Sequence, residues 1–265
     1  AYFNSTGLGV GTHSFTVTAT DSSLRIGLAS AAAIGDVTYD NVSVKLADAD
    51  RSVNDNGLVI NGTITRTAVA SGADLVGYSG FSASNYLEQP YNSDLDFGTG
   101  DFHVMGWMKW SAADRGRVFD RTTTGVSGPR LQLQSVDGKI RATAASSKLN
   151  TTSNYNTGEW VQICLTRRSG VLYIYADGQE AVSTAHTATV TNTSAIFRVG
   201  QRVGADNAFS GSLALWRIGA TAPSADQIAQ IYADEKHLFV DNAACTLYGT
   251  SDAVTALAHD PVTKE

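Results

Sequence analysis

The fold is decided by the stretch from Tyr86 to Trp110, YLEQPYNSDLDFGTGDFHVMGWMKW. Its first half is polar and rich in turn-forming residues, and its second half, residues 102–110, is an apolar run. Because side chains alternate along a strand, one face would carry Phe102, Val104, Gly106, Met108 and Trp110, and the other His103, Met105, Trp107 and Lys109. Both faces are rich in apolar residues. We therefore predict a central strand that is buried on both sides, as in a two-sheet sandwich.

The sequence after this stretch predicts further antiparallel strands. LQLQSV (residues 131–136) leads into Asp137-Gly138, and VLYIY (171–175) is followed by Asp177-Gly178. An Asp-Gly pair supplies the positive φ that a tight hairpin needs, so we expect a hairpin at each pair. Strand-like segments recur at close spacing between residues 57 and 218 without intervening helices. This pattern is typical of an all-β sandwich.

One helix is expected on the C-terminal side of these strands. Ser224 is a suitable N-cap and Gln227 stands three residues on, which is the capping-box pattern. Ile228 and the apolar residues after it fall on one helical face. We predict a helix that ends near residue 236 and packs on the edge of the sandwich.

The chain divides into three parts. Residues 1–47 alternate in short bursts and are interpreted as a partial β-segment, either the end of a preceding β-domain or an accessory sheet. A polar stretch up to residue 56 is expected to be a linker. Residues 57–236 form the predicted sandwich domain, and residues 237–265 a less regular C-terminal extension. Since the chain begins at Ala1 without Met, we expect it to be a fragment of a longer protein.

Composition excludes several kinds of partner. The net charge of −6 and the pI near 5.3 argue against non-specific binding to nucleic acid, which needs a cationic surface. No apolar run is long enough to suggest insertion into a membrane. The two cysteines, Cys164 and Cys245, are expected to be buried free thiols, with a bridge between them as the alternative.

Four phrases in order resemble a known family. These are GDFHVMGWMK (residues 100–109), GEWVQICLT (158–166), LYIYADG (172–178) and FSGSLALWRI (209–218) with the capped helix after it. Together they resemble the laminin-G-like, concanavalin A-like jelly-roll domains of bacterial and phage proteins, over about residues 57–236. The resemblance implies a two-sheet jelly-roll sandwich with one short helix on its C-terminal side and, here, a small N-terminal β-segment.

The resemblance also bears on metal binding. Members of this family usually carry an acidic residue in the terminal strand that helps to hold calcium, but this chain has Ala214 there. Loop oxygens at Asp101, Asp206 and Asn207 would still suit a hard cation. Calcium at Asp101 and Asp206 is therefore kept as a hypothesis, and no other cofactor is implied.

The acidic residues do not predict an enzyme. Glycoside hydrolysis needs two carboxyl groups that face each other across the substrate, and glucanases of this fold carry them on one strand with alternating acids. No strand of this chain has such a run. A pair from separate segments, for example Glu88 with Asp120, remains an alternative, but we predict no catalytic activity.

Binding of sugars would use aromatic rings and polar side chains in loops. The tryptophans are not the expected candidates, because Trp107 and Trp160 match core positions of the resembled family. Six residues in turn-rich segments are the predicted glycan-binding set: Tyr91, Asn92, Arg130, Tyr155, Asn156 and Asn207.

The first hypothesis for function is a non-catalytic recognition module of a phage tail fibre or similar appendage that binds bacterial surface polysaccharide. The expected location is the virion tail, with a secreted or bacterial cell-surface protein as the alternative. A homotrimer would follow from that class of appendage. The other hypotheses are a structural spacer without ligand and a glycan depolymerase.

Overall fold

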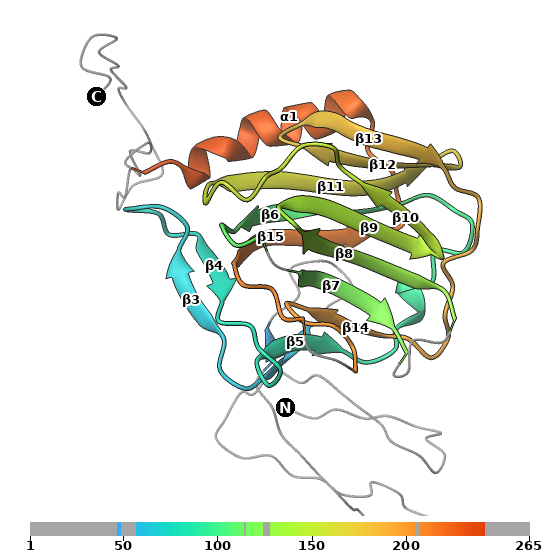
Figure 1. The fold of residues 1–265 in the computed structure, drawn as a ribbon, viewed down its shortest axis with the longest axis horizontal. Coiled ribbons are helices and arrows are strands. Elements are labelled where there is room, and N and C mark those ends of the chain that lie inside the picture. Colours follow the sequence, from blue (N-terminus) through green and yellow to red (C-terminus); the bar gives the residue numbers. More distant parts are fainter. Residues whose placement is uncertain (1–46, 49–56, 114, 124–127, 205–206, 242–265) are drawn as a thin grey trace, which may run out of the picture.

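The computed structural model describes residues 47–48, 57–113, 115–123, 128–204 and 207–241. These residues form a sandwich of two antiparallel sheets with one α-helix along one side (Figure 1). The predicted all-β fold is confirmed. The N-terminal β-segment lies outside the described residues apart from the strand β1 (Ala47–Asp48), as does the C-terminal extension beyond residue 241.

Each sheet has its own strand order. The eight-stranded sheet has the order β1-β2-β5-β14-β7-β8-β9-β10. After β1 its strands are, in chain order, β2 (Leu58–Asn61), β5 (Tyr86–Gln89), β7 (Gly116–Thr122), β8 (Arg130–Val136), β9 (Lys139–Ala145), β10 (Ser147–Asn150) and β14 (Ile196–Val199). The seven-stranded sheet has the order β13-β12-β11-β6-β15-β4-β3. Its strands are β3 (Thr65–Ala68), β4 (Val76–Ser79), β6 (Phe102–Lys109), β11 (Trp160–Arg168), β12 (Val171–Ala176), β13 (Gln179–Ala185) and β15 (Ser212–Gly219).

Strand β6 occupies the middle of the seven-stranded sheet, between β11 and β15. Phe102, Val104 and Met108 face the main core between the sheets. Met105 and Trp107 face the opposite side, where they belong to two smaller apolar clusters. The prediction that this strand is buried on both faces is therefore confirmed.

A bulge in β15 sends a large aromatic side chain into the core. The register with β6 shifts between Ala214 and Arg217, and Leu215 has a φ of 51°. The extra residue turns Trp216 inward, where its indole would collide with any Cβ at Gly106 (2.4 Å to Trp216 Cδ2). Glycine at position 106 is thus required by the ring that the bulge re-aims.

The helix α1 (Ala225–Glu235) begins as predicted. Ser224 is the N-cap, and both hydrogen bonds of its capping box with Gln227 are present. Ile228 is wholly buried and packs with Met105 on the outer side of the seven-stranded sheet, so the helix covers part of a sheet face as well as lying near its edge. No helix of the described part is long and apolar enough to cross a bilayer.

A short 3-10 helix after α1 completes this cover. It is η2 (Lys236–Phe239), and its Phe239 ring stacks on Trp107 with the ring centroids 4.1 Å apart. The indole Nε1 of Trp107 donates to Glu235 Oε2 at 2.8 Å. The predicted core position of Trp107 is confirmed, since only 2% of this residue is exposed.

Both predicted hairpins are present. Asp137 and Gly138 have φ values of 52° and 80°, and Asp177 and Gly178 values of 49° and 76°, as a two-residue hairpin turn requires. Cys164 on β11 is a free, buried thiol, and burial raises its pKa to about 12. Cys245 lies outside the described residues.

Two buried glutamines make a test of hydrogen bonding in this fold. Gln162 on β11 is 0% exposed, and neither its Oε1 nor its Nε2 has a partner within the described part of the chain. Gln132 on β8 is 2% exposed, but its Nε2 donates to Asp120 Oδ1 at 2.6 Å. A buried amide without partners carries its full desolvation cost, whereas a bonded one does not.

We therefore expect Gln162→Leu to raise the free energy of unfolding by about 1 kcal/mol. The matched change Gln132→Leu should lower it by about 2 kcal/mol, since it leaves a buried carboxylate oxygen without a donor. Urea denaturation of both variants measures the two values. Destabilisation by Gln162→Leu would show that its amide has partners after all.

Candidate functional site

The two outer faces of the sandwich differ in what covers them. The apolar outer face of the seven-stranded sheet lies under α1 and η2. The outer face of the eight-stranded sheet has no helix over it in the described part of the chain (Figure 1). The middle of this face is nevertheless occupied by protein, since Asp120 there is 0% exposed and accepts the Val203 N–H, so a ligand would reach the partly exposed side chains around it.

Strand alternation makes this uncovered face polar. In β8, Leu131 and Leu133 are 0% exposed in the core, so Arg130, Gln132 and Gln134 lie on the outer side. In β9, Ile140, Ala142 and Ala144 are in the core, which places Arg141 and Thr143 on the same outer side. Side chains directly opposite each other on neighbouring strands share a face, so these residues form one surface.

The register extends this surface across the sheet. Arg117 and Asp120 on β7 pair with Gln134 and Gln132. Arg198 on β14 pairs with Asp120 on one side and with Glu88 of β5 on the other. We call this surface the arginine face; its charged residues include Glu88, Arg117, Asp120, Arg130, Arg141 and Arg198 on the strands, and Arg202, which is close enough to Arg117 to lower its pKa.

At the β5 side of the arginine face, charges are paired. Arg198 Nε donates to Glu88 Oε2 at 2.6 Å and Arg198 Nη1 to Gln201 Oε1 at 3.0 Å. The Arg198 guanidinium also lies 4.1 Å from the centre of the Tyr86 ring. Tyr86 and Glu88 alternate with the core residue Leu87, so an aromatic ring and an ion pair stand together on this face.

In the middle of the face, a buried carboxylate stands among arginines. Asp120 is 0% exposed and accepts hydrogen bonds from Gln132 and from the Val203 N–H (2.9 Å). Burial raises the pKa of Asp120, while these bonds and the nearby arginines Arg117 and Arg202 oppose that rise.

The pKa of the neighbouring Arg117 is shifted in the opposite direction. Burial lowers the pKa of Arg117 to about 10. Asp120 opposes this effect, but Arg202, Arg130 and Arg141 each lower the pKa of Arg117 further. The arginines are thus close enough to repel one another, and Arg117 still carries its charge at neutral pH.

The structure separates the six predicted sugar-binding residues. Tyr91 is 42% exposed and its hydroxyl donates to Asp96 Oδ2 at 2.8 Å. Asn92 caps the 3-10 helix η1 (Ser93–Leu95) by accepting the Asp94 N–H. Arg130 lies on the arginine face, toward this same end of the sandwich.

The other three predicted residues lie toward the opposite end, where β8 turns into β9. The Tyr155 N–H donates to Gly138 O at 2.8 Å, and Asn156 Nδ2 donates to Ser111 O at 3.2 Å. The Asn207 carbonyl accepts the Arg117 N–H at 3.0 Å. The six residues therefore do not form one cluster, and sugar binding by them stays a prediction.

Four charged members of the arginine face were missed by sequence reasoning: Arg117, Arg141, Arg198 and Arg202. The signal within reach was alternation, since RLQLQ at residues 130–134 and KIRAT at 139–143 place a polar residue at every second position. Polar residues inside strands were passed over in favour of loop residues.

The structure describes two of the three hypothetical calcium ligands, Asp101 and Asn207. Asp101 begins the segment that leads into β6, and its Oδ1 accepts the Ser169 N–H at 2.9 Å. Asn207 lies near the other end of β6, beside Arg117 and close to Phe209, which packs on Trp110. Asp101 and Asn207 therefore cannot hold one ion together, and Asp206 lies outside the described residues.

No group of three or more His, Cys, Asp or Glu side chains in the described ranges could hold a metal ion. Calcium binding consequently stays a hypothesis that gains no ligand set from these residues.

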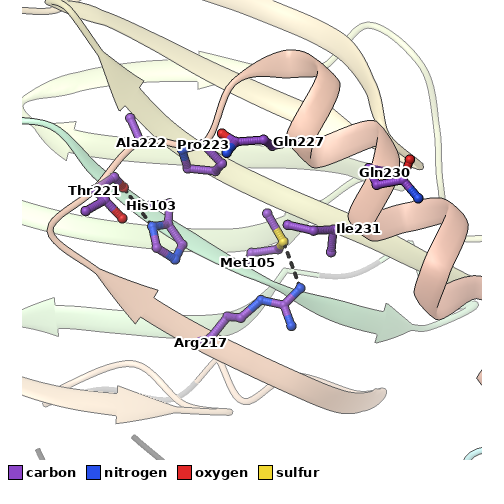
Figure 2. A pocket seen from close by; sticks show the side chains of 9 residues that line it. All are labelled: His103, Met105, Arg217, Thr221, Ala222, Pro223, Gln227, Gln230 and Ile231. Carbon is purple, nitrogen blue, oxygen red and sulfur yellow. Dashed lines mark hydrogen bonds between the residues drawn. The ribbon is translucent and has the colours of Figure 1, made fainter. Parts of the chain in front are cut away.

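A groove on the far side of the sandwich is the competing location. It has a volume of about 560 Å³ and lies between α1 and the outer side of β6 and β15 (Figure 2). In this groove Arg217 donates a hydrogen bond to Met105 Sδ and forms an ion pair with Glu235. His103 Nδ1 is hydrogen-bonded to the Thr221 carbonyl at 2.7 Å. Because its charged and polar groups are largely engaged within the protein, the groove is less suited to a polar ligand than the arginine face.

Comparison with known proteins concerns most of the sandwich. Residues 81–229, more than half of the chain, match the family profile described as the concanavalin A-like lectin/glucanases superfamily. The comparison with curated proteins found no match.

Solved structures show the same architecture at low sequence identity. Domain 4 of AbnA, an extracellular arabinanase from Geobacillus stearothermophilus, superposes with a TM-score of 0.57 at 19% identity, over 70% of this chain and 93% of that domain. The binding domain of Paraclostridial Mosquitocidal Protein 1 gives 0.56 at 13% identity, over 70% and 49%. The binding domain of Botulinum neurotoxin DC gives 0.55 at 13% identity, over 70% and 48%. This chain thus spans about half the length of the two toxin domains, and these likenesses concern the fold alone.

The end of the sandwich near Tyr91 depends on one carboxylate. Asp96 pairs with Arg121, which is 1% exposed, and it also accepts the Asn192 N–H (2.9 Å) and the Tyr91 hydroxyl. Burial acts to raise the pKa of Asp96, but these three hydrogen bonds outweigh it and the pKa is lowered. The ionised form therefore stabilises the folded state, and this stabilisation is lost as the pH falls through the lowered pKa.

We expect Asp96→Asn to lower the free energy of unfolding at pH 7 by about 2 kcal/mol, since it leaves the buried Arg121 charge without its counterion. The variant should also lose less stability than the parent protein as the pH falls below about 4. Thermal unfolding between pH 7 and pH 2 measures both effects. Asp137→Asn is the control, because Asp137 is exposed in the β8–β9 turn and Asn tolerates its positive φ. If the melting temperatures of the parent protein and of Asp96→Asn fell equally between about pH 4 and pH 2, the role given to the ionised Asp96 would be contradicted.

Proposed function

Since the chain belongs to the concanavalin A-like lectin/glucanase superfamily, we propose that it is a non-catalytic recognition module that binds a glycan. The arginine face is the binding surface in this proposal. The observation that carries it is a sheet face without a helix over it in the described part of the chain, whose partly exposed arginines lie on the same face as the Tyr86 ring. Sugar recognition combines such polar groups with aromatic rings.

The ligands of the structural neighbours support a glycan as the partner. The AbnA domain was solved in complex with arabinotriose. The Botulinum neurotoxin DC domain was solved with SialylT, and the serotype D ligand-binding domain with N-acetylneuraminic acid. Each of these ligands is a sugar, and each protein shares the fold of this chain.

For the biological setting, we propose bacterial surface polysaccharide as the partner and a phage tail fibre or similar appendage as the whole protein, located in the virion tail. A secreted or cell-surface protein is the alternative. Support comes from the sequence: residues 247–261, outside the described part, resemble the segment found after this domain in some phage tail proteins. A homotrimer is proposed from the same class of appendage.

A glycan depolymerase is the second candidate, because Glu88 and Asp120 share the arginine face. Both pair with Arg198 in register, so their Cα atoms are two strand spacings, roughly 10 Å, apart. However, Glu88 is held by Arg198 and Asp120 is wholly buried with both oxygens accepting hydrogen bonds. Neither carboxyl is free to act on a substrate, which favours binding over hydrolysis.

The direct experiment is an array of bacterial surface polysaccharides, on which bound protein and released reducing ends are measured together, with and without a calcium chelator. We expect binding without release. Release that is abolished by Glu88→Gln would establish the depolymerase instead. Loss of binding in chelator would show a calcium requirement, and the absence of both binding and release would favour a structural spacer.

A pair of variants tests which surface binds. Tyr86→Ala removes the ring on the arginine face. It should weaken binding of the polysaccharide that the array identifies about tenfold. Tyr173→Ala removes a ring of β12, on the seven-stranded sheet and in the cluster beside α1, and should leave binding unchanged. Isothermal titration gives both affinities, and circular dichroism checks that each variant is folded. The reverse result would place the ligand on the α1 side of the sandwich.

A further inference from the structure

The arginine face holds more positive than negative charge. Its arginines are Arg117, Arg130, Arg141, Arg198 and Arg202, and its carboxylates are Glu88 and Asp120. Glu88 is paired with Arg198, and Asp120 takes its two shortest hydrogen bonds from Gln132 and the Val203 N–H. The positive charge of the other arginines is therefore only partly balanced by the protein.

The hydrogen bonds of these arginines are incomplete. Nε and Nη1 of Arg117, Nε of Arg130 and Nε of Arg202 are buried and have no hydrogen-bond partner in the described ranges. A buried charged donor without an acceptor is costly, so such atoms are rare in folded proteins. The buried edge of each guanidinium is closed to solvent, so an acceptor from outside has to approach the part that remains exposed.

Elsewhere the same fold satisfies its arginines. Arg121 is 1% exposed and donates to Asp96 and to the Val190 and Asn192 carbonyls. Arg167 is 0% exposed and donates to the Gly98, Gly100 and Ala188 carbonyls. Arginines with a structural role are thus supplied with acceptors by the chain, and Arg117, Arg130 and Arg202 of the arginine face differ from them in this respect.

The arginines of the face also repel one another. Arg130, Arg141 and Arg202 each act to lower the pKa of Arg117, in addition to burial. An anion bound to the exposed part of these guanidinium groups would offset this repulsion. Carboxylate and sulfate oxygens suit the planar fork of a guanidinium, which binds oxyanions through two parallel hydrogen bonds.

We propose that the arginine face binds the oxyanion substituents, carboxylate or sulfate, of an acidic glycan. This inference rests on the proposed function and narrows it to one chemical class of polysaccharide. A nucleic acid is the other class of polyanion, and a glycan is preferred here because the chain matches the concanavalin A-like lectin/glucanases superfamily.

The test measures binding of the full chain to five polymers: a polyuronate, the same polyuronate with its carboxyl groups reduced to alcohols, a sulfated polysaccharide, a neutral polysaccharide and single-stranded DNA. We expect binding to the polyuronate or to the sulfated polymer, which identifies the oxyanion. Reduction of the carboxyl groups should weaken binding to the polyuronate at least tenfold if carboxylate is the ligand. Binding should also fall at least about tenfold between about 50 and 300 mM sodium chloride, because salt screens exposed charges.

Variants assign the binding to the face. Arg117→Gln and Arg130→Gln should each weaken binding of the acidic polymer about tenfold, and the double variant more. Because each change removes a buried charge with incomplete hydrogen bonds, the melting temperature should stay the same or rise. Arg66→Gln on β3 of the other sheet is the matched control, with the same loss of charge and unchanged binding expected.

The outcomes separate this inference from the proposed function. Equal binding of neutral, reduced and acidic polysaccharides would overturn the inference and leave glycan recognition standing. Equal or tighter binding of single-stranded DNA would overturn it in favour of a general polyanion site. Failure to bind any of the five polymers, together with no binding on the bacterial polysaccharide array, would overturn both the inference and the proposed glycan recognition. A higher melting temperature of Arg117→Gln with unchanged binding would show that the cluster has no ligand of this class.

Discussion

The structure depends on strand β6, which carries apolar side chains on both of its faces. One face needs the second sheet, and the other needs a cover of its own, which α1 and η2 provide through Ile228 and Phe239. The one α-helix of the described part therefore covers the seven-stranded sheet. The outer side of the eight-stranded sheet is mainly polar, so this side needs no helix to cover it. The location of the candidate site follows from this asymmetry.

Charge is used in two ways within the same sandwich. Arg121 and Arg167 tie loop carbonyls together at one end, and their burial is balanced by acceptors from the chain itself. On the arginine face, Arg117 and Arg130 lie on strands and Arg202 follows β14, and each of the three has a buried nitrogen without an acceptor in the described part of the chain. An imbalance of this kind persists because the many core contacts on the other side of the same strands hold the backbone in place.

Local sequence signals predicted much of the fold but little of the site. The two Asp-Gly turns and the capping box at Ser224 depend on neighbouring residues, so the sequence alone was sufficient for them. The bulge that turns Trp216 inward depends on the packing against Gly106, which no local pattern reveals. The arginine face required the strand order, because β14 joins β5 and β7 from far along the chain. Loop residues such as Tyr91 and Tyr155 are similar in type, yet the connections that hold them, from β5 to β6 and from β10 to β11, cross between the sheets at opposite ends.

Every outward residue of β8 and β9 alternates with a core residue, which gives the outer face a regular spacing of positions. Neighbouring positions are about 4.8 Å apart across the strands and about 6.7 Å apart along them. A substitution at Arg130 or Arg141, which are partly exposed, would alter the chemistry displayed on the surface while Leu131 and Ala142 keep the interior intact. Sheets of this kind can therefore change the ligand they bind through single substitutions on the outer face. The same property makes the face suitable for engineering new binding specificities.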